Sequence, residues 1–183
     1  MGKIKRFEDI NIQAQNIGAA GVERDVRISP EVLQEVLDDE DIHVSDPLLI
    51  HYGLEQGEDS VHARVKIEGR ISTICVRCLG DMVYNIDLDL ETTYLPALSD
   101  MPDDLESDRV SSEFGYYRRD IRLGAFIRSE LVLSLPLRYI CSPDCKGLCS
   151  VCGANLNKGP CGCKKEIDPR LKKLAILKKD IRR

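Results

Sequence analysis

Residues Ser60–Leu95 read SVHARVKIEGRISTICVRCLGDMVYNIDLDLETTYL, and this stretch carries the clearest β pattern in the chain. Apolar and polar residues alternate from Val61 to Ile71, and again from Tyr84 to Tyr94, on either side of the segment CVRCLG. Alternation with a period of two is typical of strands that bury one face. We therefore predict an antiparallel β-hairpin that turns at CVRCLG.

One register of this hairpin satisfies both of its faces. In that register three pairs lie opposite one another: Lys66 and Asp89, Arg64 and Glu91, and Val65 and Leu90. Each pair of opposite charges across two strands contributes about 0.2–1 kcal/mol. We expect the hairpin to adopt this register, with its charged residues on one face and its apolar residues on the other.

Two helices are predicted outside the hairpin. In DVRISPEVLQEVLDDED, Ser29 suits the N-cap and Pro30 suits the first helical position. In DIRLGAFIRSELVLSLP, leucine or isoleucine recurs every four residues over 123–135, which predicts a core helix. Asp120 is its expected cap, and Pro136 would end it.

Composition places the chain among globular proteins. Its 183 residues are 43% hydrophobic and 31% charged, enough for one substantial core or two small ones. The opening MGKIKRFEDINIQ lacks the apolar run of a secretory signal, and no apolar stretch approaches the roughly 20 residues needed to cross a bilayer. We expect a cytoplasmic protein without a membrane partner.

Six of the eight cysteines fall within CSPDCKGLCSVCGANLNKGPCGC, residues 141–163. The cytosol keeps thiols reduced, so clustered cysteines there are more often metal ligands than disulfides. A Cys-x-x-Cys turn sets two sulfurs within reach of one ion, and a following glycine permits the tight backbone that this needs. Zinc is the leading candidate, and we expect two ions, one in each of two sites.

The favoured grouping joins Cys149 and Cys152 with Cys161 and Cys163, and leaves a second tetrad that ties the hairpin turn to the later segment. Cys145 and Cys149 are close enough in sequence to exchange roles or to share a bimetallic cluster. All-thiolate sets also suit iron–sulfur clusters. The candidate metal ligands are Cys75, Cys78, Cys141, Cys145, Cys149, Cys152, Cys161 and Cys163.

Signals for catalysis are weak. His43, His51 and His62 are spread along the sequence, in or near predicted strands or acidic segments, and are most simply surface or packed residues. The chain has no Gly-x-Ser-x-Gly, no phosphate-binding loop and no His-Glu-x-x-His. A zinc ion held by four cysteines lacks the open position that hydrolysis requires. We therefore expect a protein that is not an enzyme.

These elements predict an α+β fold: an antiparallel sheet with a core helix, followed by a C-terminal Cys-rich, zinc-ribbon-like module. Residues 1–140 would form the α+β body, with Cys-x-x-Cys at the tip of its hairpin. Residues 141–183 would form the zinc module and a basic C-terminal helix. Residues 164–183 contain nine Lys or Arg and three acidic residues, in a chain of net charge −5. The candidate RNA-binding residues are Lys164, Lys165, Arg170, Lys172, Lys173, Lys178 and Lys179.

Four segments together resemble one known family: CVRCL at the hairpin turn, LVLSLPL at the end of the core helix, the cysteine-rich stretch with its CGANLN, and DPRLKKL. They look like the YceD family, the large ribosomal RNA subunit accumulation proteins, over roughly residues 61–177. The resemblance implies a role in the making or accumulation of 23S ribosomal RNA, and it brings no catalytic residue with it.

The expected function is therefore a non-enzymatic ribosome-biogenesis factor that supports 23S rRNA synthesis, processing or accumulation. Its expected partner is a ribosomal RNA precursor, or a large-subunit ribosomal protein or assembly factor. The protein alternative is serious because the chain is net acidic and only 5% aromatic, so it lacks an evident platform for stacking single-stranded bases. A competing hypothesis is a zinc–thiol redox sensor or regulatory protein.

Overall fold

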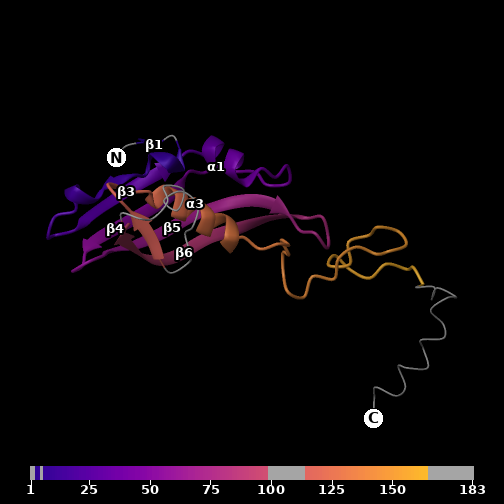
Figure 1. Ribbon diagram of the computed structural model, residues 1–183. Helices are drawn as coiled ribbons and strands as arrows, with labels where there is room; N and C mark the ends of the chain where they lie inside the picture. The colour runs from indigo at the N-terminus through magenta and orange to yellow at the C-terminus, as the bar shows by residue number, and fades with distance from the viewer. Residues whose placement is uncertain (1–2, 5, 99–113, 165–183) are drawn as a thin grey trace, which may run out of the picture. The chain divides into compact units, whose positions relative to one another are not determined.

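The computed structural model describes residues 3–4, 6–98 and 114–164. A six-stranded sheet has the order β1-β3-β4-β5-β6-β7 (Figure 1), and β2 pairs with β8 in a two-stranded sheet. The strands are β1 (Lys3–Ile4), β2 (Ile12–Gln13), β3 (Val22–Ile28), β4 (Leu48–Gln56), β5 (Val61–Ile74), β6 (Asp81–Pro96), β7 (Phe114–Tyr117) and β8 (Asp120–Ile121). The described helices are α1 (Pro30–Leu37) and α3 (Leu123–Ser134), with 3-10 turns η1 (Phe7–Asp9) and η2 (Ala14–Asn16).

The α+β class is confirmed, and the sheet is mixed at its edges. Strands β3 to β6 pair antiparallel in sequence order. The short edge strands differ, because β1 pairs parallel with β3 and β7 pairs parallel with β6. The predicted antiparallel sheet is therefore its centre, and the parallel edges are an addition that the alternation pattern did not indicate.

The predicted hairpin is β5 and β6, and its register is confirmed. Val65 lies opposite Leu90, and the two charge pairs follow from the same register: Lys66 opposite Asp89 and Arg64 opposite Glu91. The ion pairs of the basic members are nevertheless made elsewhere. Arg64 Nη2 lies 3.1 Å from Glu55 Oε2 on β4, and Lys66 Nζ lies 3.2 Å from Glu68 Oε1 on its own strand. The side chains of both ion pairs are exposed, so solvent screens them and each pair contributes little to stability.

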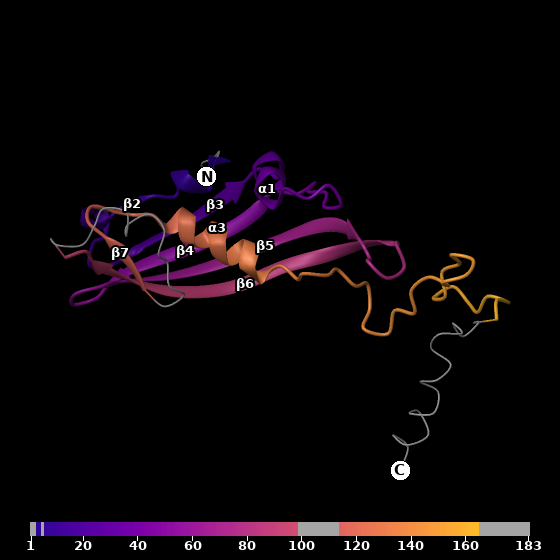
Figure 2. The same cartoon turned by 45° about the vertical axis from the view of Figure 1, so that its right-hand side comes forward.

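The hydrophobic core lies between one face of the sheet and α3, which runs across that face (Figure 2). On α3 the buried side chains are Leu123, Phe126, Ile127 and Leu131. Three of them are on the predicted four-residue spacing, whereas its last position, Leu135, is the C-cap residue and is only partly buried. On β5 the inward residues alternate from Val61 to Ile71. Burying one Leu, Ile or Phe side chain stabilises the fold by about 1.5–3 kcal/mol, so this interface supplies much of the stability of the body.

The predicted cap of the core helix was wrong. Asp120 lies in β8, where it pairs with Gln13, and the N-cap position of α3 belongs to Arg122. A backbone group replaces the side-chain cap, because the N–H of Gly124 donates to the carbonyl oxygen of Ile10 at 3.0 Å. The first N–H groups of a helix have no acceptor within the helix, so a carbonyl oxygen from another segment can serve as well as a side chain.

The first predicted helix is α1, with Ser29 at the N-cap position and Pro30 at the first helical position. The Ser29 side chain makes no capping hydrogen bond. Gln34 instead anchors the segment that follows α1: its amide donates to the carbonyl oxygen of Ile42 at 2.7 Å and accepts from the N–H of Val44 at 3.0 Å.

The chain forms two compact units. The first comprises residues 1–74 and 81–139, and the second comprises the hairpin turn, residues 75–80, with residues 140–183. The predicted basic C-terminal helix lies outside the described residues. Among the described residues, no helix is long and apolar enough to span a membrane.

Candidate metal centres

The turn between β5 and β6 is shaped by backbone hydrogen bonds. The N–H of Cys75 donates to the carbonyl oxygen of Gly80, and the N–H of Leu79 donates to that of Cys75, both at 2.8 Å. Leu79 adopts a left-handed conformation with φ of 53°, which is uncommon outside glycine. These backbone bonds close the Cys-x-x-Cys turn that carries Cys75 and Cys78.

Four cysteines converge at this turn and form what we call cluster A: Cys75, Cys78, Cys141 and Cys145. Their sulfur atoms all lie within 4.8 Å of one another. The Sγ atoms of Cys75 and Cys145 are 3.8 Å apart, and those of Cys78 and Cys141 are 3.7 Å apart. Four thiolates bonded at about 2.3 Å to one tetrahedral ion lie about 3.8 Å from each other. The spacing of cluster A therefore fits a single tetrahedral ion.

The other four cysteines form cluster B: Cys149, Cys152, Cys161 and Cys163. Their sulfurs also lie within 4.8 Å of one another. The turn at Cys149 is closed by the N–H of Gly153, which donates to the Cys149 carbonyl oxygen at 2.9 Å. Cluster B is more open to solvent than cluster A, because Cys152 is exposed and Cys161 and Cys163 are half-buried. These are the two quartets that the spacing of the sequence favoured, and each could hold a metal ion.

Arg77 joins the hairpin turn to the segment before cluster B. Its guanidinium donates to the carbonyl oxygens of Cys145, at 3.2 Å, and Pro143, at 3.4 Å. Its own carbonyl oxygen accepts from the N–H of Leu148 at 3.1 Å. The strand-to-strand turn and residues 143–148 are thus held together by hydrogen bonds as well as by cluster A.

Hydrogen bonds to sulfur lower the pKa of some thiols in each cluster and raise the pKa of others. The N–H of Cys141 donates to Cys75 Sγ at 3.4 Å and lowers the Cys75 pKa to about 6. In cluster B the backbone N–H groups of Cys152 and Val151 lower the Cys149 pKa to about 6. Such donors stabilise the thiolate, which is the form that binds metal.

In other thiols of the clusters the pKa is shifted in the opposite direction, as in Cys141 and Cys163. Hydrogen bonding to the sulfurs of Cys145 and Cys75 raises the Cys141 pKa to about 12, and hydrogen bonding to Cys152 raises the Cys163 pKa to about 12. Four sulfurs this close cannot all be thiolates without a counter-charge. A divalent cation among them supplies that charge, so the donor set of each cluster suits a metal.

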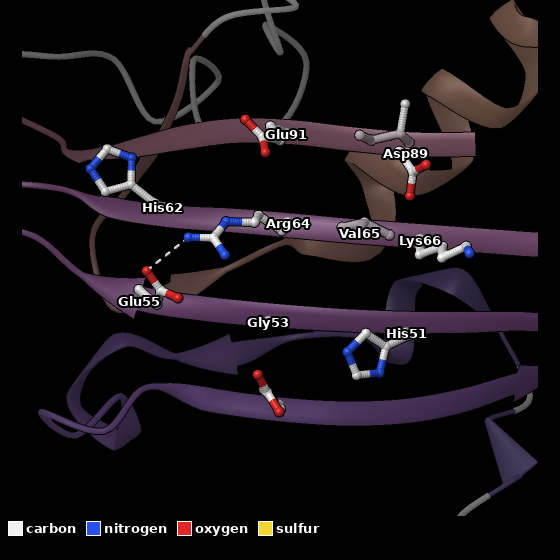
Figure 3. Close-up of a pocket in the computed structure, with 11 residues that line it drawn as sticks. His51, Gly53, Glu55, His62, Arg64, Val65, Lys66, Asp89 and Glu91 are labelled. Carbon is white, nitrogen blue, oxygen red and sulfur yellow. Dashed lines mark hydrogen bonds and ion pairs between the residues drawn. The ribbon is translucent and has the colours of Figure 1, made fainter.

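Two of the three histidines lie on the charged face of the sheet. A hollow of about 430 Å³ opens on the charged face of the sheet, with His51 and His62 in its lining (Figure 3). His51 Nδ1 lies 2.8 Å from Asp25 Oδ1, and His62 Nδ1 lies 3.0 Å from the hydroxyl oxygen of Thr93. Each ring is therefore tied to a neighbouring strand, and the hollow contains none of the cysteines.

Comparison with known proteins adds the family. The model of the large ribosomal RNA subunit accumulation protein YceD matches residues 63–178, which is more than half of the chain. The chain belongs to the YceD family. The matched range nearly coincides with the range of the sequence resemblance, and it contains the hairpin turn and both cysteine clusters.

Relatives of this YceD-family chain match it over shorter stretches. Large ribosomal RNA subunit accumulation protein YCED homolog 1, chloroplastic, of Zea mays is 45% identical over 47 residues, 25% of this chain and 16% of that protein. Its Arabidopsis thaliana counterpart is 42% identical over 48 residues, 26% of this chain and 15% of that protein. An uncharacterized protein of Mycobacterium bovis is 31% identical over 120 residues, 63% of this chain and 56% of that protein.

The chain thus spans less than two thirds of the length of each of these relatives. No solved structure matches the chain.

The predicted RNA-binding residues fall mostly outside the described part of the chain. Lys164 is described and exposed, whereas the other six lie beyond residue 164. Asn157 was not predicted, although its side-chain amide donates to Cys145 Sγ at 3.3 Å. The signal for it was weak, because an asparagine in a loop rich in Gly and Asn is most simply a turn residue.

Proposed function

We propose that this YceD-family protein is a non-enzymatic factor in biogenesis of the large ribosomal subunit. It supports 23S rRNA synthesis, processing or accumulation by binding an RNA precursor or a large-subunit ribosomal protein. The observation that carries the proposal is that the family match spans two cysteine quartets with metal-binding geometry. A site of four cysteines around one ion is closed, so its role is to fold a binding module and not to activate water.

Zinc is the metal that we assign to both clusters, with all eight cysteines as ligands. The sulfur spacing in cluster A supports one ion per quartet, because a [4Fe–4S] cluster would require four sulfurs spread around several irons. The module over residues 141–183 would then be a zinc-ribbon-like unit that includes the hairpin turn, attached to a body over residues 1–140. Two zinc ions per purified, reduced chain are expected by elemental analysis, and iron in their place would overturn the assignment.

Basic residues of the second unit support contact with RNA. In its described part the basic residues are Arg77, Lys146, Lys158 and Lys164, against the single acidic residue Asp144. The sequence beyond residue 164 adds eight further Lys or Arg. Metal binding would hold residues 140–164 in place, and the basic sequence continues from their end. Its cations could then neutralise phosphates. The cytoplasmic location expected from the sequence stays a prediction.

RNA contact is tested by replacing Lys172, Lys173, Lys178 and Lys179 with Ser. We expect affinity for large-subunit precursor RNA to fall at least about tenfold at low salt, because contacts with phosphates are lost. Each lost contact should also reduce the magnitude of the logarithmic salt slope by about 0.7–0.9. The measurement is a binding titration at two salt concentrations. A matched control removes the same charge from the sheet, with Arg27, Arg64, Lys66 and Arg70 replaced by Ser. Unchanged affinity and slope in the lysine variant would exclude this segment as the RNA contact and would favour a ribosomal protein as the direct partner.

A zinc–thiol redox sensor is the second candidate, and the openness of cluster B favours it. Cys152 is exposed, and the lowered pKa of Cys149 makes its sulfur a thiolate near neutral pH, the form that oxidants attack. A sensor would release zinc on titration with a mild oxidant and recover it on reduction. Retention of zinc until the fold opens would leave the biogenesis factor as the function.

A further inference from the structure

We propose that Asn157 couples the two cysteine clusters, so that a metal ion bound at cluster B raises the affinity of cluster A. The inference rests on the proposed metal binding and adds to it a positioning residue and a coupling between the two sites. It concerns the second unit alone, which contains all eight cysteines.

Asn157 lies in the loop of cluster B but acts on a ligand of cluster A. Its side-chain Nδ2 donates to Cys145 Sγ at 3.3 Å, and its Oδ1 accepts from the N–H of Lys146 at 2.8 Å. One amide group therefore holds both the sulfur of Cys145 and the backbone that follows it. Because Cys145 is buried, its sulfur has little water to replace that donor.

Cluster B controls where Asn157 lies. Residues 153–160 form a loop whose two ends are the cluster B ligands Cys152 and Cys161. The loop is folded back by backbone hydrogen bonds: the N–H of Leu156 donates to Gly147 at 2.9 Å, and the N–H of Cys149 donates to Ala154 at 2.8 Å. These bonds lie in a unit whose described residues bury little apart from cysteines, so an ion that closes the loop at both ends determines whether Asn157 stays in place.

The clusters also differ in where their ligands lie in the chain. The ligands of cluster B all lie within residues 149–163, whereas cluster A joins Cys75 and Cys78 to cysteines more than 60 residues later. Cluster B therefore closes on its own stretch of chain, and an ion bound there positions Asn157 for cluster A.

The size of the coupling can be judged from hydrogen bonds to metal ligands in other proteins. Removing a hydrogen-bond partner of a metal ligand typically lowers metal affinity about 10–100-fold. Asn157 is itself exposed, so water competes for its amide and the lower end of that range applies. Coupling between two sites is reciprocal, so an ion at cluster A must raise the affinity of cluster B by the same factor.

The test is a double-mutant cycle on the full reduced chain, read by Co²⁺ absorption and by competition between Zn²⁺ and a chromophoric chelator. Cys163→Ser removes one ligand of cluster B, and Cys78→Ser provides the reverse case in which cluster B is observed without cluster A. We expect Cys163→Ser and Asn157→Ala each to weaken cluster A about tenfold. In the Cys163→Ser background, Asn157→Ala should cause no further loss, because the loop that places Asn157 is already open.

A spectroscopic readout separates positioning from a general loss of structure. In ¹¹³Cd²⁺-loaded protein, Asn157→Ala should shift the cluster A resonance and leave the cluster B resonance in place, since only Cys145 loses a donor. Asn157→Asp should weaken cluster A further than Asn157→Ala, because a carboxylate faces the thiolate. Lys158→Ala, on the neighbouring exposed residue, serves as the control without an effect on either resonance.

Two results would overturn the coupling. Cluster A of Cys163→Ser could bind metal as tightly as the wild-type protein. Alternatively, Asn157→Ala could weaken cluster A equally whether or not cluster B is intact, which would make Asn157 a partner of Cys145 alone. Either result would leave the proposal of two zinc sites standing, because that proposal is judged by the metal-to-protein ratio.

Discussion

Gly147 and Gly153 have the same backbone conformation but different surroundings. Both adopt φ of 71°, in the left-handed region. A Cβ added to Gly147 would lie 3.0 Å from the carbonyl oxygen of Arg77, whereas a Cβ added to Gly153 would have no neighbour within 4 Å among the described residues. The Arg77 carbonyl also accepts the N–H of Leu148, so crowding at Gly147 acts on the connection between the hairpin turn and the later cysteines.

Replacing each glycine with alanine therefore separates conformational strain from crowding. Gly153→Ala should cost about 1–2 kcal/mol of left-handed strain, which corresponds to roughly a tenfold loss of zinc affinity at cluster B. Gly147→Ala should carry the same strain and also displace Arg77, and so weaken both clusters. Chelator competition on each variant measures the losses. Equal losses confined to cluster B would contradict the role given to Gly147.

Among the helices and strands, those with a repeating pattern of apolar residues could be predicted from the sequence. The long alternation in β5 and β6 specified the hairpin and its register, and the four-residue spacing specified the buried face of α3. Strands β1 and β7 were not predicted, because two and four residues are too few to show a period. The Asp120 cap failed for a tertiary reason, since a carbonyl oxygen from a distant segment fills the place of the cap.

The same distinction holds for the candidate site. The cysteine quartets could be grouped from spacing because paired cysteines in tight turns are a local signal. Asn157 could not, because its contact with Cys145 exists only once the loop has folded back. The residues beyond 164 were assigned from charge alone, and their contacts with a partner depend on that partner.

Close packing of α3 against η1 leads to a prediction at this scale. A Cβ added to Gly124 would overlap the carbonyl oxygen of Phe7, so Gly124→Ala must push α3 away from η1. We expect the free energy of unfolding of the first unit to fall by about 1–3 kcal/mol, as overpacking of a core does. Urea unfolding followed by circular dichroism measures the change.

Gly18→Ala is the matched control for Gly124→Ala. A Cβ at Gly18 would meet none of the described residues within 4 Å, and the glycine lies outside the left-handed region. This substitution should be neutral, or should stabilise the protein by up to about 1 kcal/mol through the unfolded chain. A loss as large as that of Gly124→Ala would show that the contact with Phe7 is not the cause.

On the scale of the whole molecule, the two units differ in what holds them together. The first unit contains the hydrophobic core of sheet and helix. In the described part of the second unit, the buried hydrophobic residues are the cysteines Cys75, Cys78, Cys145 and Cys149, and none of its residues belongs to that core. With so little apolar surface buried among its described residues, the second unit depends on the metal–ligand bonds proposed above, which are available only in the metal-bound state.

Removing the metal should therefore unfold the second unit and leave the first one folded. With a strong chelator under reducing conditions, we expect the amide signals of residues 75–80 and 140–164 to move to random-coil positions in a proton–nitrogen correlation spectrum. Signals from the sheet and α3 should keep their dispersion, because the core does not depend on the ions. Dispersed signals from the second unit in metal-free protein would contradict the proposed zinc sites.

Cys149→Ser separates the contribution of cluster B from that of cluster A. It removes one ligand of cluster B and should disorder the segment after Leu148, while β5 and β6 stay paired through their own register. Because Asn157 lies in that segment, the variant should also weaken cluster A about tenfold, less than the complete loss that a cluster A variant such as Cys78→Ser would cause. Ser150→Ala, a change at the adjacent exposed residue, should leave both clusters intact. A Cys149→Ser spectrum in which residues 149–164 stay ordered would mean that backbone hydrogen bonds, and not the ion, hold the loop of cluster B.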